Sequence, residues 1–496
     1  MRFNPARKRD SHFKSEWPDL KESKGELFTA RPSLRKLVVL VDNELLVEDT
    51  AAWNKESLLS GLLTHPYIRM VRYTDSALPP TVTKMHSPWA GEFVPGWAIL
   101  RPRHKETNEI REFVVANDET ATIHAIYGSA ALIARSDSSH PAYSDLPADE
   151  AAGKREADAI AARVAEEISA DIYITRREYL TESPTPRTDN TSICTPGDAV
   201  PLVGLFLRRQ GVFMYFRSVD GGFQFNCSQR IYFFTGAMDL LPSAWRWSNA
   251  CGQSAEATGD DGLAALSSSL VQRVERALQS RDDLFFALNT VGNRDSTDAA
   301  LRSLDTALIF LMGAIDVSAR VAHRVLQISL SQRNAGWQNP AWLQRVQLLA
   351  PGLAAIFNQG SDAQHLLEIL RKFRNSVHGE ALSPLTLSEG SKPERILVGL
   401  PREDLKAILD SMDALGGRSA WGVESPWENR MYSDPGILLD NILRRALVIL
   451  NKIMHETPVE MLPDVRITPA ACEPPSDPHG RYSEMKREGI RWQLGF

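Results

Sequence analysis

The sequence has little cysteine, no long apolar stretch and no excess of positive charge, and each absence excludes a class of protein. Its four cysteines, Cys194, Cys227, Cys251 and Cys472, include no Cys-x-x-Cys pair, and no histidine pair lies nearby at metal-ligand spacing. This spacing argues against a zinc site or a disulfide framework. The longest apolar run, residues 307–315, is about half the length that a bilayer crossing needs. We therefore expect a cytoplasmic protein without a membrane partner.

The net charge is −6, because 62 acidic residues outnumber 56 basic ones in a chain of 496 residues. A protein that coats nucleic acid by overall attraction carries the opposite balance. Any contact with nucleic acid must therefore be local. With 43% apolar and 24% charged residues, the chain has the composition of a folded protein, and its length predicts two to four domains.

The first half of the chain alternates between strand-like and helix-like patterns. Residues 1–36 form a basic leader with ten Lys and Arg against five Asp and Glu. This leader is either an arm that binds phosphate or a solvated, frayed end, and the second interpretation is favoured. Residues 37–211 then alternate short β-branched runs with helical periodicity. Such alternation predicts an α/β domain with a parallel sheet covered by helices.

The second half is helical in pattern. Residues 212–262 predict a β-hairpin that turns at 220–222, followed by a Gly-rich and Ser-rich linker at 249–262. Residues 263–456 carry apolar positions at helical spacing, which predicts an all-α bundle. The proline-rich residues 457–496 predict an irregular tail.

One predicted helix, residues 362–378, has sequence signals for both its start and its end. Ser361 and Gln364 have the spacing of a capping box, and Gly379 supplies a left-handed stop. The apolar positions that share one face of this helix are Leu366, Leu370, Phe373 and Val377. A polar stripe with Arg371, Arg374 and His378 lies about a quarter-turn away.

An arginine beside a histidine suits phosphodiester chemistry. The guanidinium can hold a phosphate oxygen through two donors, and its charge disfavours the imidazolium form of His378. The imidazole then acts as a base or an acid near neutral pH, with no metal required. In RNA the 2′-hydroxyl is an internal nucleophile that DNA lacks. Such a site would therefore cleave RNA and leave a cyclic phosphate end.

The run Arg374-Asn375-Ser-Val-His378-Gly, at the end of a helix, resembles the HEPN superfamily, whose ribonucleases carry an Arg, four to six residues and then a His. Six residues intervene if Arg371 is the partner of His378, and three if it is Arg374, so both arginines stay candidates. The resemblance implies an endoribonuclease that needs no cofactor, acts as a homodimer on RNA and serves in phage defence or as a toxin. The alternatives are a noncatalytic binder of nucleotides or of a partner, or a structural role in which these side chains pair with Glu368 or Glu380.

In the first domain, the order of a strand ending in Asp42, a helix with Asp158 and a strand followed by Thr175 resembles PIN-like nucleases. The resemblance implies Mg²⁺ or Mn²⁺ held by Asp42 and Asp158 at the carboxyl edge of a parallel sheet. However, Arg177 stands where the family places an acid. A degenerate domain is therefore favoured over an active one.

Other interpretations of these acids stay open. The remaining metal ligand would come from Asn43, Glu44, Glu150 or Glu178. Alternatively, Asp42 and Asp158 are ordinary solvated acids at the ends of a strand and a helix.

Overall fold

The computed structural model groups the chain into two compact units. The first holds residues 1–227, 391–393 and 492–496, and the second holds residues 228–390 and 394–491. The structure describes residues 35–46, 53–75, 85–87, 91–93, 95–101, 110–117, 120–182, 188, 191–214, 218–219, 222–223, 227–290, 294–378, 382–387, 395–427, 430–475 and 482–496. The predicted basic leader lies almost entirely outside these residues.

The first unit is built on a seven-stranded sheet in the order β7-β6-β5-β2-β1-β8-β9. The strands are β1 (Leu37–Asp42), β2 (Ile68–Thr74), β5 (Gly96–Leu100), β6 (Ile110–Ala116), β7 (Ala121–Tyr127), β8 (Ile172–Ile174) and β9 (Ser192–Cys194). Five neighbouring strands, β5, β2, β1, β8 and β9, run parallel to one another. Strands β6 and β7 add an antiparallel edge beside β5. The predicted α/β domain is therefore confirmed in outline, with a mixed rather than purely parallel sheet.

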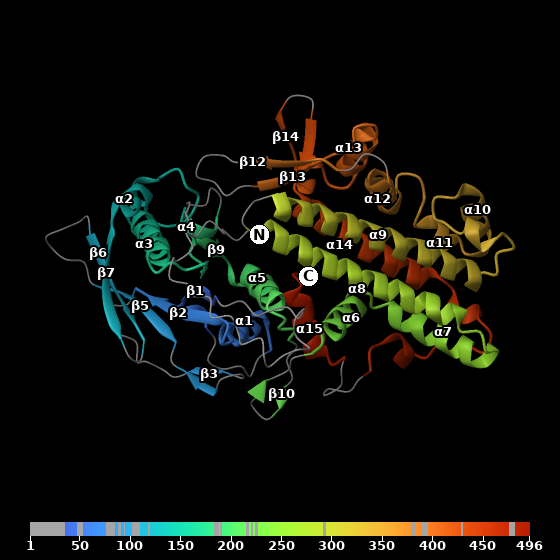
Figure 1. Cartoon of the computed structure of the whole chain (residues 1–496), viewed down its shortest axis with the longest axis horizontal. Helices are drawn as coiled ribbons and strands as arrows, with labels where there is room; N and C mark the ends of the chain where they lie inside the picture. Colours follow the sequence, from blue (N-terminus) through green and yellow to red (C-terminus); the bar gives the residue numbers. More distant parts are fainter. Residues whose placement is uncertain are drawn as a thin grey trace, which may run out of the picture. The chain divides into compact units, whose positions relative to one another are not determined.

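Helices cover this sheet. They are α1 (Lys55–Leu63), α2 (Ser129–Ser136), α3 (Ala148–Glu167), α4 (Glu178–Thr181) and α5 (Pro196–Arg209). One core contains side chains of α2, α3 and α4 together with Leu40 of β1 and Tyr173 of β8, and α1 packs on α5. Figure 1 shows α2 and α3 lying along one side of the strands. Three short elements complete this part: η1 (Asn43–Leu45) and the paired strands β3 (Met85–Ser87) and β4 (Gly91–Phe93).

The chain leaves β1 on one side toward β2 and returns on the other side at β8, so the strand order reverses at β1. In open α/β sheets such a reversal opens a crevice outside the carboxyl ends of the two strands. Residues 42 and 175 lie at these ends. The topology therefore brings the predicted acidic site to the place where such folds bind ligands.

The second unit is largely helical, as predicted. Its helices are α6 (Gln229–Leu240), α7 (Ala244–Thr258), α8 (Gly262–Leu288), α9 (Arg294–Val325), α10 (Pro340–Leu349), α11 (Pro351–Ala355), α12 (Asp362–His378), α13 (Leu405–Ala414), α14 (Pro435–Glu456) and most of α15 (Glu484–Gln493). The long helices α8, α9 and α14 run side by side, and α12 packs on α9 and α13 (Figure 1). Short 3-10 turns are η2 (Gln332–Asn334), η3 (Arg418–Trp421), η4 (Val459–Met461) and η5 (Pro469–Cys472). Within the described ranges, no helix combines the length and apolar composition needed to cross a membrane.

Three predictions for this half of the chain need correction. The bundle is not all-α, because a four-stranded antiparallel sheet follows α12 in the order β12-β13-β15-β14. These strands are β12 (Pro384–Leu387), β13 (Arg395–Gly399), β14 (Val423–Trp427) and β15 (Arg430–Ser433). The segment expected as a linker, 249–262, instead forms the end of α7 and the start of α8. The expected irregular tail ends in α15, and its last five residues belong to the first unit.

The predicted hairpin is present only in part. Strands β10 (Ser218–Val219) and β11 (Gly222–Phe223) pair antiparallel. After the hairpin the chain forms helix α6, at residues 229–240, within the region that was expected to hold the hairpin and the linker. The Asp220-Gly221 part of the expected turn lies outside the described residues.

Helix α12 forms where the sequence predicts it. The Ser361 hydroxyl accepts a hydrogen bond from the Gln364 amide at 3.2 Å, which is one half of the expected capping box. The Gln364 side chain accepts instead from the amide of Gly360, at 2.5 Å, one residue before the expected donor. Leu370 and Phe373 are fully buried, which fixes the rotation of the helix, while the side chain of Val377 lies outside the described residues.

This packing gives a test of how α12 is held. Phe373→Ala should lower the free energy of unfolding by about 3–5 kcal/mol, because it leaves a cavity at a fully buried position. Asn375→Ala, at an exposed position on the same helix, should change it by less than about 0.5 kcal/mol. Chemical denaturation followed by circular dichroism measures both. Equal losses for the two variants would contradict the observed rotation of α12.

Candidate functional site

The register of the central strands aligns three polar side chains. Asp42 on β1 is paired with Tyr73 on β2, and Val41 is paired with Ile174 on β8. Thr175, the next residue, therefore lies beside Asp42. Because alternate residues of a strand point to opposite faces, Asp42 lies on the same face as Leu40, which packs in the core with α3.

Asp42 is buried and fully engaged. Its side chain is 2% exposed. The Tyr173 hydroxyl donates to one carboxylate oxygen at 2.7 Å, and the Thr175 hydroxyl donates to the other at 2.6 Å. The guanidinium of Arg177 lies 3.4 Å from the second oxygen. This carboxylate is therefore held by two hydroxyls and one cation.

Asp158 approaches the same guanidinium from α3. Its side chain is 3% exposed, and Arg177 Nη1 donates to it at 3.1 Å. The Tyr143 hydroxyl donates to its other oxygen at 2.6 Å. Burial raises the pKa of Asp158, while the hydrogen bond from Tyr143 and the charge of Arg177 act in the opposite direction. The predicted pair Asp42 and Asp158 is thus brought together, with Arg177 between them.

A third carboxylate completes the arrangement, which we call the Arg177 cluster. Arg177 Nη2 donates to Asp75 at 3.1 Å, and the guanidinium lies over the ring of Tyr73 at 5.3 Å. Arg177 is 14% exposed, whereas Asp75 is half exposed. Sequence reasoning missed Asp75, although it directly follows strand β2 as Asp42 ends β1. One planar guanidinium therefore bridges acids from two strand ends and a helix.

The residues present do not fit a divalent metal ion. All four oxygens of Asp42 and Asp158 already accept hydrogen bonds from protein donors, and the space between them holds a guanidinium. A magnesium ion needs near-octahedral oxygen ligands at about 2.1 Å, which this arrangement does not leave. Among the described residues, no group of three or more His, Cys, Asp or Glu is arranged to hold a metal.

The four residues considered as substitute metal ligands differ in their surroundings. The Asn43 side chain accepts from Arg72 at 2.7 Å, and Glu178 accepts from the Tyr143 amide at 2.9 Å. Glu150 is exposed at the start of α3. Glu44 feels Asp42 electrostatically, and burial together with that charge raises the pKa of its carboxyl. Asn43 and Glu178 are therefore occupied and Glu150 is exposed, whereas Glu44 lies within electrostatic reach of Asp42, Asp75 and Arg177.

The second predicted site lies on α12. Arg371 is 43% exposed and donates to both carboxylate oxygens of Glu368, at 3.0 and 3.1 Å. Arg374 is half-buried and has no ion-pair partner among the described residues, and Asn375 is exposed. His378 is the last residue of α12, but its side chain lies outside the described residues. Pairing with Glu368, an alternative raised by the sequence, thus holds for Arg371 alone.

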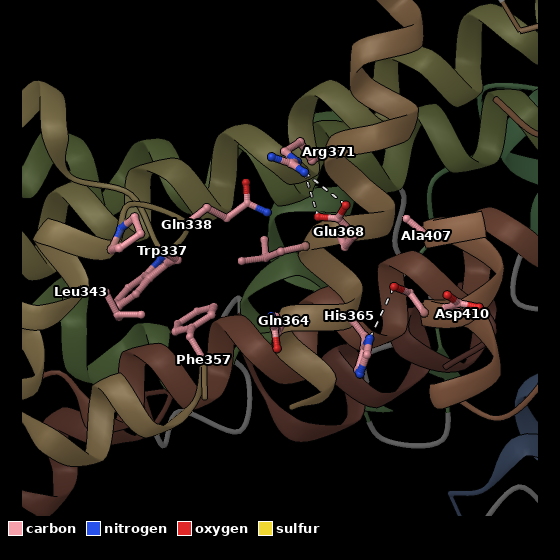
Figure 2. Close-up of a pocket in the computed structure, with 13 residues that line it drawn as sticks. Trp337, Gln338, Leu343, Phe357, Gln364, His365, Glu368, Arg371, Ala407 and Asp410 are labelled. Carbon is pink, nitrogen blue, oxygen red and sulfur yellow. Dashed lines mark hydrogen bonds and ion pairs between the residues drawn. The ribbon is translucent and has the colours of Figure 1, made fainter. Parts of the chain in front are cut away.

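A pocket of about 540 Å³ opens beside α12. Figure 2 shows Trp337 and Phe357 on one side of it and Arg371, Glu368 and His365 of α12 on the other. The two aromatic rings stack with centroids 4.5 Å apart. Sequence reasoning missed this pocket because its lining comes from three separate helices and the segments before and after α10 and α11.

Comparison of the chain with protein-family models, curated proteins and solved structures finds no match in any of the three. The site therefore has to be interpreted from its own geometry.

The Arg177 cluster predicts a large effect of removing one side chain. Arg177→Gln leaves Asp42 and Asp158 buried without a cation and should lower the free energy of unfolding by about 3–5 kcal/mol. The matched control is Arg176→Gln, whose arginine is 59% exposed and pairs with Glu56. It should cost less than about 1 kcal/mol. Calorimetry of the full chain measures both, and equal stability of the two variants would contradict a structural role for Arg177.

The Arg177→Gln variant also tests whether the Arg177 cluster binds a divalent metal ion. Because Arg177 supplies the positive charge, neither MnCl₂ nor EDTA should change the melting temperature of the wild-type chain. In Arg177→Gln the acids are left without a counter-charge, so MnCl₂ should restore part of the lost melting temperature. Wild-type stabilisation by MnCl₂ that disappears in Asp42→Asn would show instead that this crevice binds metal with Arg177 in place.

Proposed function

We propose that this protein is an endoribonuclease whose catalytic side chains, Arg374 and His378, lie on α12. The observation that carries the proposal is that Arg374 has no ion-pair partner among the described residues. It lies four residues before His378 in the same helix, and side chains at this spacing are neighbours, with Cβ atoms about 6 Å apart. An arginine without a counter-ion beside a histidine is suited to bind a phosphodiester.

The contacts of the two candidate arginines favour Arg374 over Arg371. Both oxygens of Glu368 occupy Arg371, so a phosphate would have to compete with a bound carboxylate. Among the described residues, Arg374 acts electrostatically on Asp316 without forming an ion pair with it. Burial raises the pKa of Asp316, and the surrounding arginines only oppose this shift. Because no described acid forms an ion pair with Arg374, we assign its charge to a phosphate of the substrate.

The chemistry follows from the two groups. The imidazole of His378 takes the proton of the RNA 2′-hydroxyl, and the 2′-oxygen forms a bond to the adjacent phosphorus. The bond from phosphorus to the 5′-oxygen breaks, and that oxygen takes up a proton. Arg374 stabilises the charge that develops on the phosphoryl oxygens. The products carry a 2′,3′-cyclic phosphate and a free 5′-hydroxyl.

The pocket beside α12 provides a place for a base. Its carboxylates, Glu368 and Asp410, outnumber its single arginine, Arg371, which disfavours a phosphate there. The aromatic rings and the side-chain amide of Gln364 suit a planar group that forms hydrogen bonds. We therefore place a nucleobase in this pocket and the scissile phosphate farther along α12, near Arg374.

The first unit receives no catalytic role in this proposal, because Arg177 already neutralises its buried acids. The HEPN resemblance adds two inferences: the active species is a homodimer that pairs two α12 helices, and it degrades RNA in phage defence or as a toxin. The cysteine pattern and the short apolar runs add the inference that the protein acts in the cytoplasm. The mass of the active species in solution tests the first of these inferences.

Cleavage assays test the assignment directly. The purified chain should cut single-stranded RNA in EDTA, leave a 2′,3′-cyclic phosphate and spare DNA of the same sequence. His378→Ala and Arg374→Ala should each lower kcat by roughly 100-fold or more, because each removes a group that acts in the transition state. Arg371→Ala, one turn away on the same helix, should lower it by less than about tenfold.

Three outcomes would overturn this function. Equal cutting by wild type and His378→Ala would remove α12 from the mechanism. If the protein turns over no RNA but its melting temperature rises with added nucleotide, it is a noncatalytic binder. Loss of cutting on adding EDTA, together with loss in Asp42→Asn, would assign the activity to the first unit.

A further inference from the structure

Three arginines from three helices surround one carboxylate in the second unit. Asp316 on α9 lies within electrostatic reach of Arg273 on α8, Arg320 on α9 and Arg374 on α12. None of the three arginines has an ion-pair partner among the described residues, and Arg273 Nε is buried without a hydrogen-bond partner. We call Arg273, Arg320 and Arg374 the arginine cluster.

The position of Arg273 is fixed by a glycine. A Cβ at Gly313 would lie 3.1 Å from Cζ of Arg273, which is closer than most real Cβ contacts, so the absent side chain makes room for the guanidinium. Glycine inside a helix costs about 1 kcal/mol relative to alanine. Here it allows an arginine of α8 to lie against the backbone of the 32-residue helix α9.

Helical spacing places the rest of the cluster on the same side. Gly313, Asp316 and Arg320 are three and four residues apart on α9, so they follow one face over two turns. Helix α12 packs on α9, and Arg374 is on the part of α12 that Phe373 anchors. Arg320 is exposed, while Arg273 and Arg374 are half-buried. Asp316 thus lies within electrostatic reach of arginines from α8, α9 and α12.

The positive charges of this cluster have no direct counter-charge among the described residues. Three arginines lie within electrostatic reach of Asp316, and none of them forms an ion pair with it or with another described acid. Burial raises the pKa of Asp316 despite the three arginines, as expected when they stand too far away for direct ion pairs. Arginines that are held in place and not neutralised are what a protein uses to bind phosphate groups.

We propose that the arginine cluster binds consecutive phosphates of a single nucleic-acid strand and leads that strand to His378. This inference rests on the proposed ribonuclease function, because it names the backbone contacts of the same substrate. Arg374 belongs both to the arginine cluster and to the proposed catalytic site, so it would bind the phosphate that reacts. Arg273 and Arg320 bind only phosphates that do not react. They are positioning residues, and no motif in the sequence indicates them.

The experiment measures binding separately from cleavage. In the full-length His378→Ala background, the affinity for a fluorescent single-stranded RNA is measured by anisotropy at several KCl concentrations. Arg273→Gln and Arg320→Gln should each weaken binding roughly tenfold at 0.1 M KCl, because each removes a charged hydrogen bond to phosphate. Each should also reduce the slope of log Kd against log salt by about 0.7, the value expected for one lost phosphate contact on a single strand.

Matched variants distinguish binding at the arginine cluster from the effect of lowering the overall positive charge of the chain. Arg302→Gln removes one positive charge from an exposed position near the start of α9 and should leave both affinity and slope unchanged. Arg273→Lys keeps the charge at the half-buried position and should retain most of the salt slope. This variant also serves as the folded reference if Arg273→Gln lowers the melting temperature. Single-stranded DNA should show the same losses as RNA, since the contacts are to phosphate.

The outcomes distinguish the cluster from the nuclease. If Arg273→Gln and Arg320→Gln bind RNA with the same affinity and slope as Arg302→Gln, the cluster does not contact the strand, even if His378→Ala abolishes cutting. If both variants lose affinity and slope while the wild type cuts no RNA, the phosphate site stands and the ribonuclease function fails. Losses for RNA but none for DNA would contradict readout of phosphate and overturn the inference.

Discussion

A charge buried in a protein needs a partner of opposite sign, and this constraint explains the centre of the first unit. The reversal of strand order at β1 brings Asp42 and Asp158 together in a place shielded from water. Two such carboxylates repel each other unless a cation lies between them. Arg177 provides that cation from the chain itself. The guanidinium of Arg177 therefore lies between Asp42 and Asp158, in the position that a metal ion would need.

The second unit shows the opposite balance. There Arg273, Arg320 and Arg374 lie within electrostatic reach of Asp316, and none of them has an ion-pair partner among the described residues. An excess of fixed positive charge suits a phosphate ligand, which explains how a chain with a net charge of −6 would bind RNA locally. In the proposed function, the first unit has no catalytic role and the helical unit contacts the nucleic acid.

Much of the fold was predictable because its signals are local. The apolar run of β1 and the start of α12 were found from neighbouring residues, and the structure has both. Gly379, the predicted stop of α12, lies outside the described residues. Strands β12 to β15 were missed because β13 pairs with β15 more than thirty residues later, which no local pattern shows. In the expected linker, Gly259 has a φ of +72° and ends α7, so its glycine was a helix stop rather than a sign of flexibility.

The sequence by itself determined which residues were available: acids at strand ends, an arginine two residues after Thr175, and a stripe of arginines and a histidine on one amphipathic helix. Only the tertiary structure decided which charges meet. It placed Arg177 among three acids and paired Arg371 with Glu368. It also placed Arg273 against Gly313, and both Arg273 and Arg374 within electrostatic reach of Asp316. The physical reason is that electrostatic partners are chosen by distance in space, and distances between separate helices and strands follow from packing rather than from order along the chain.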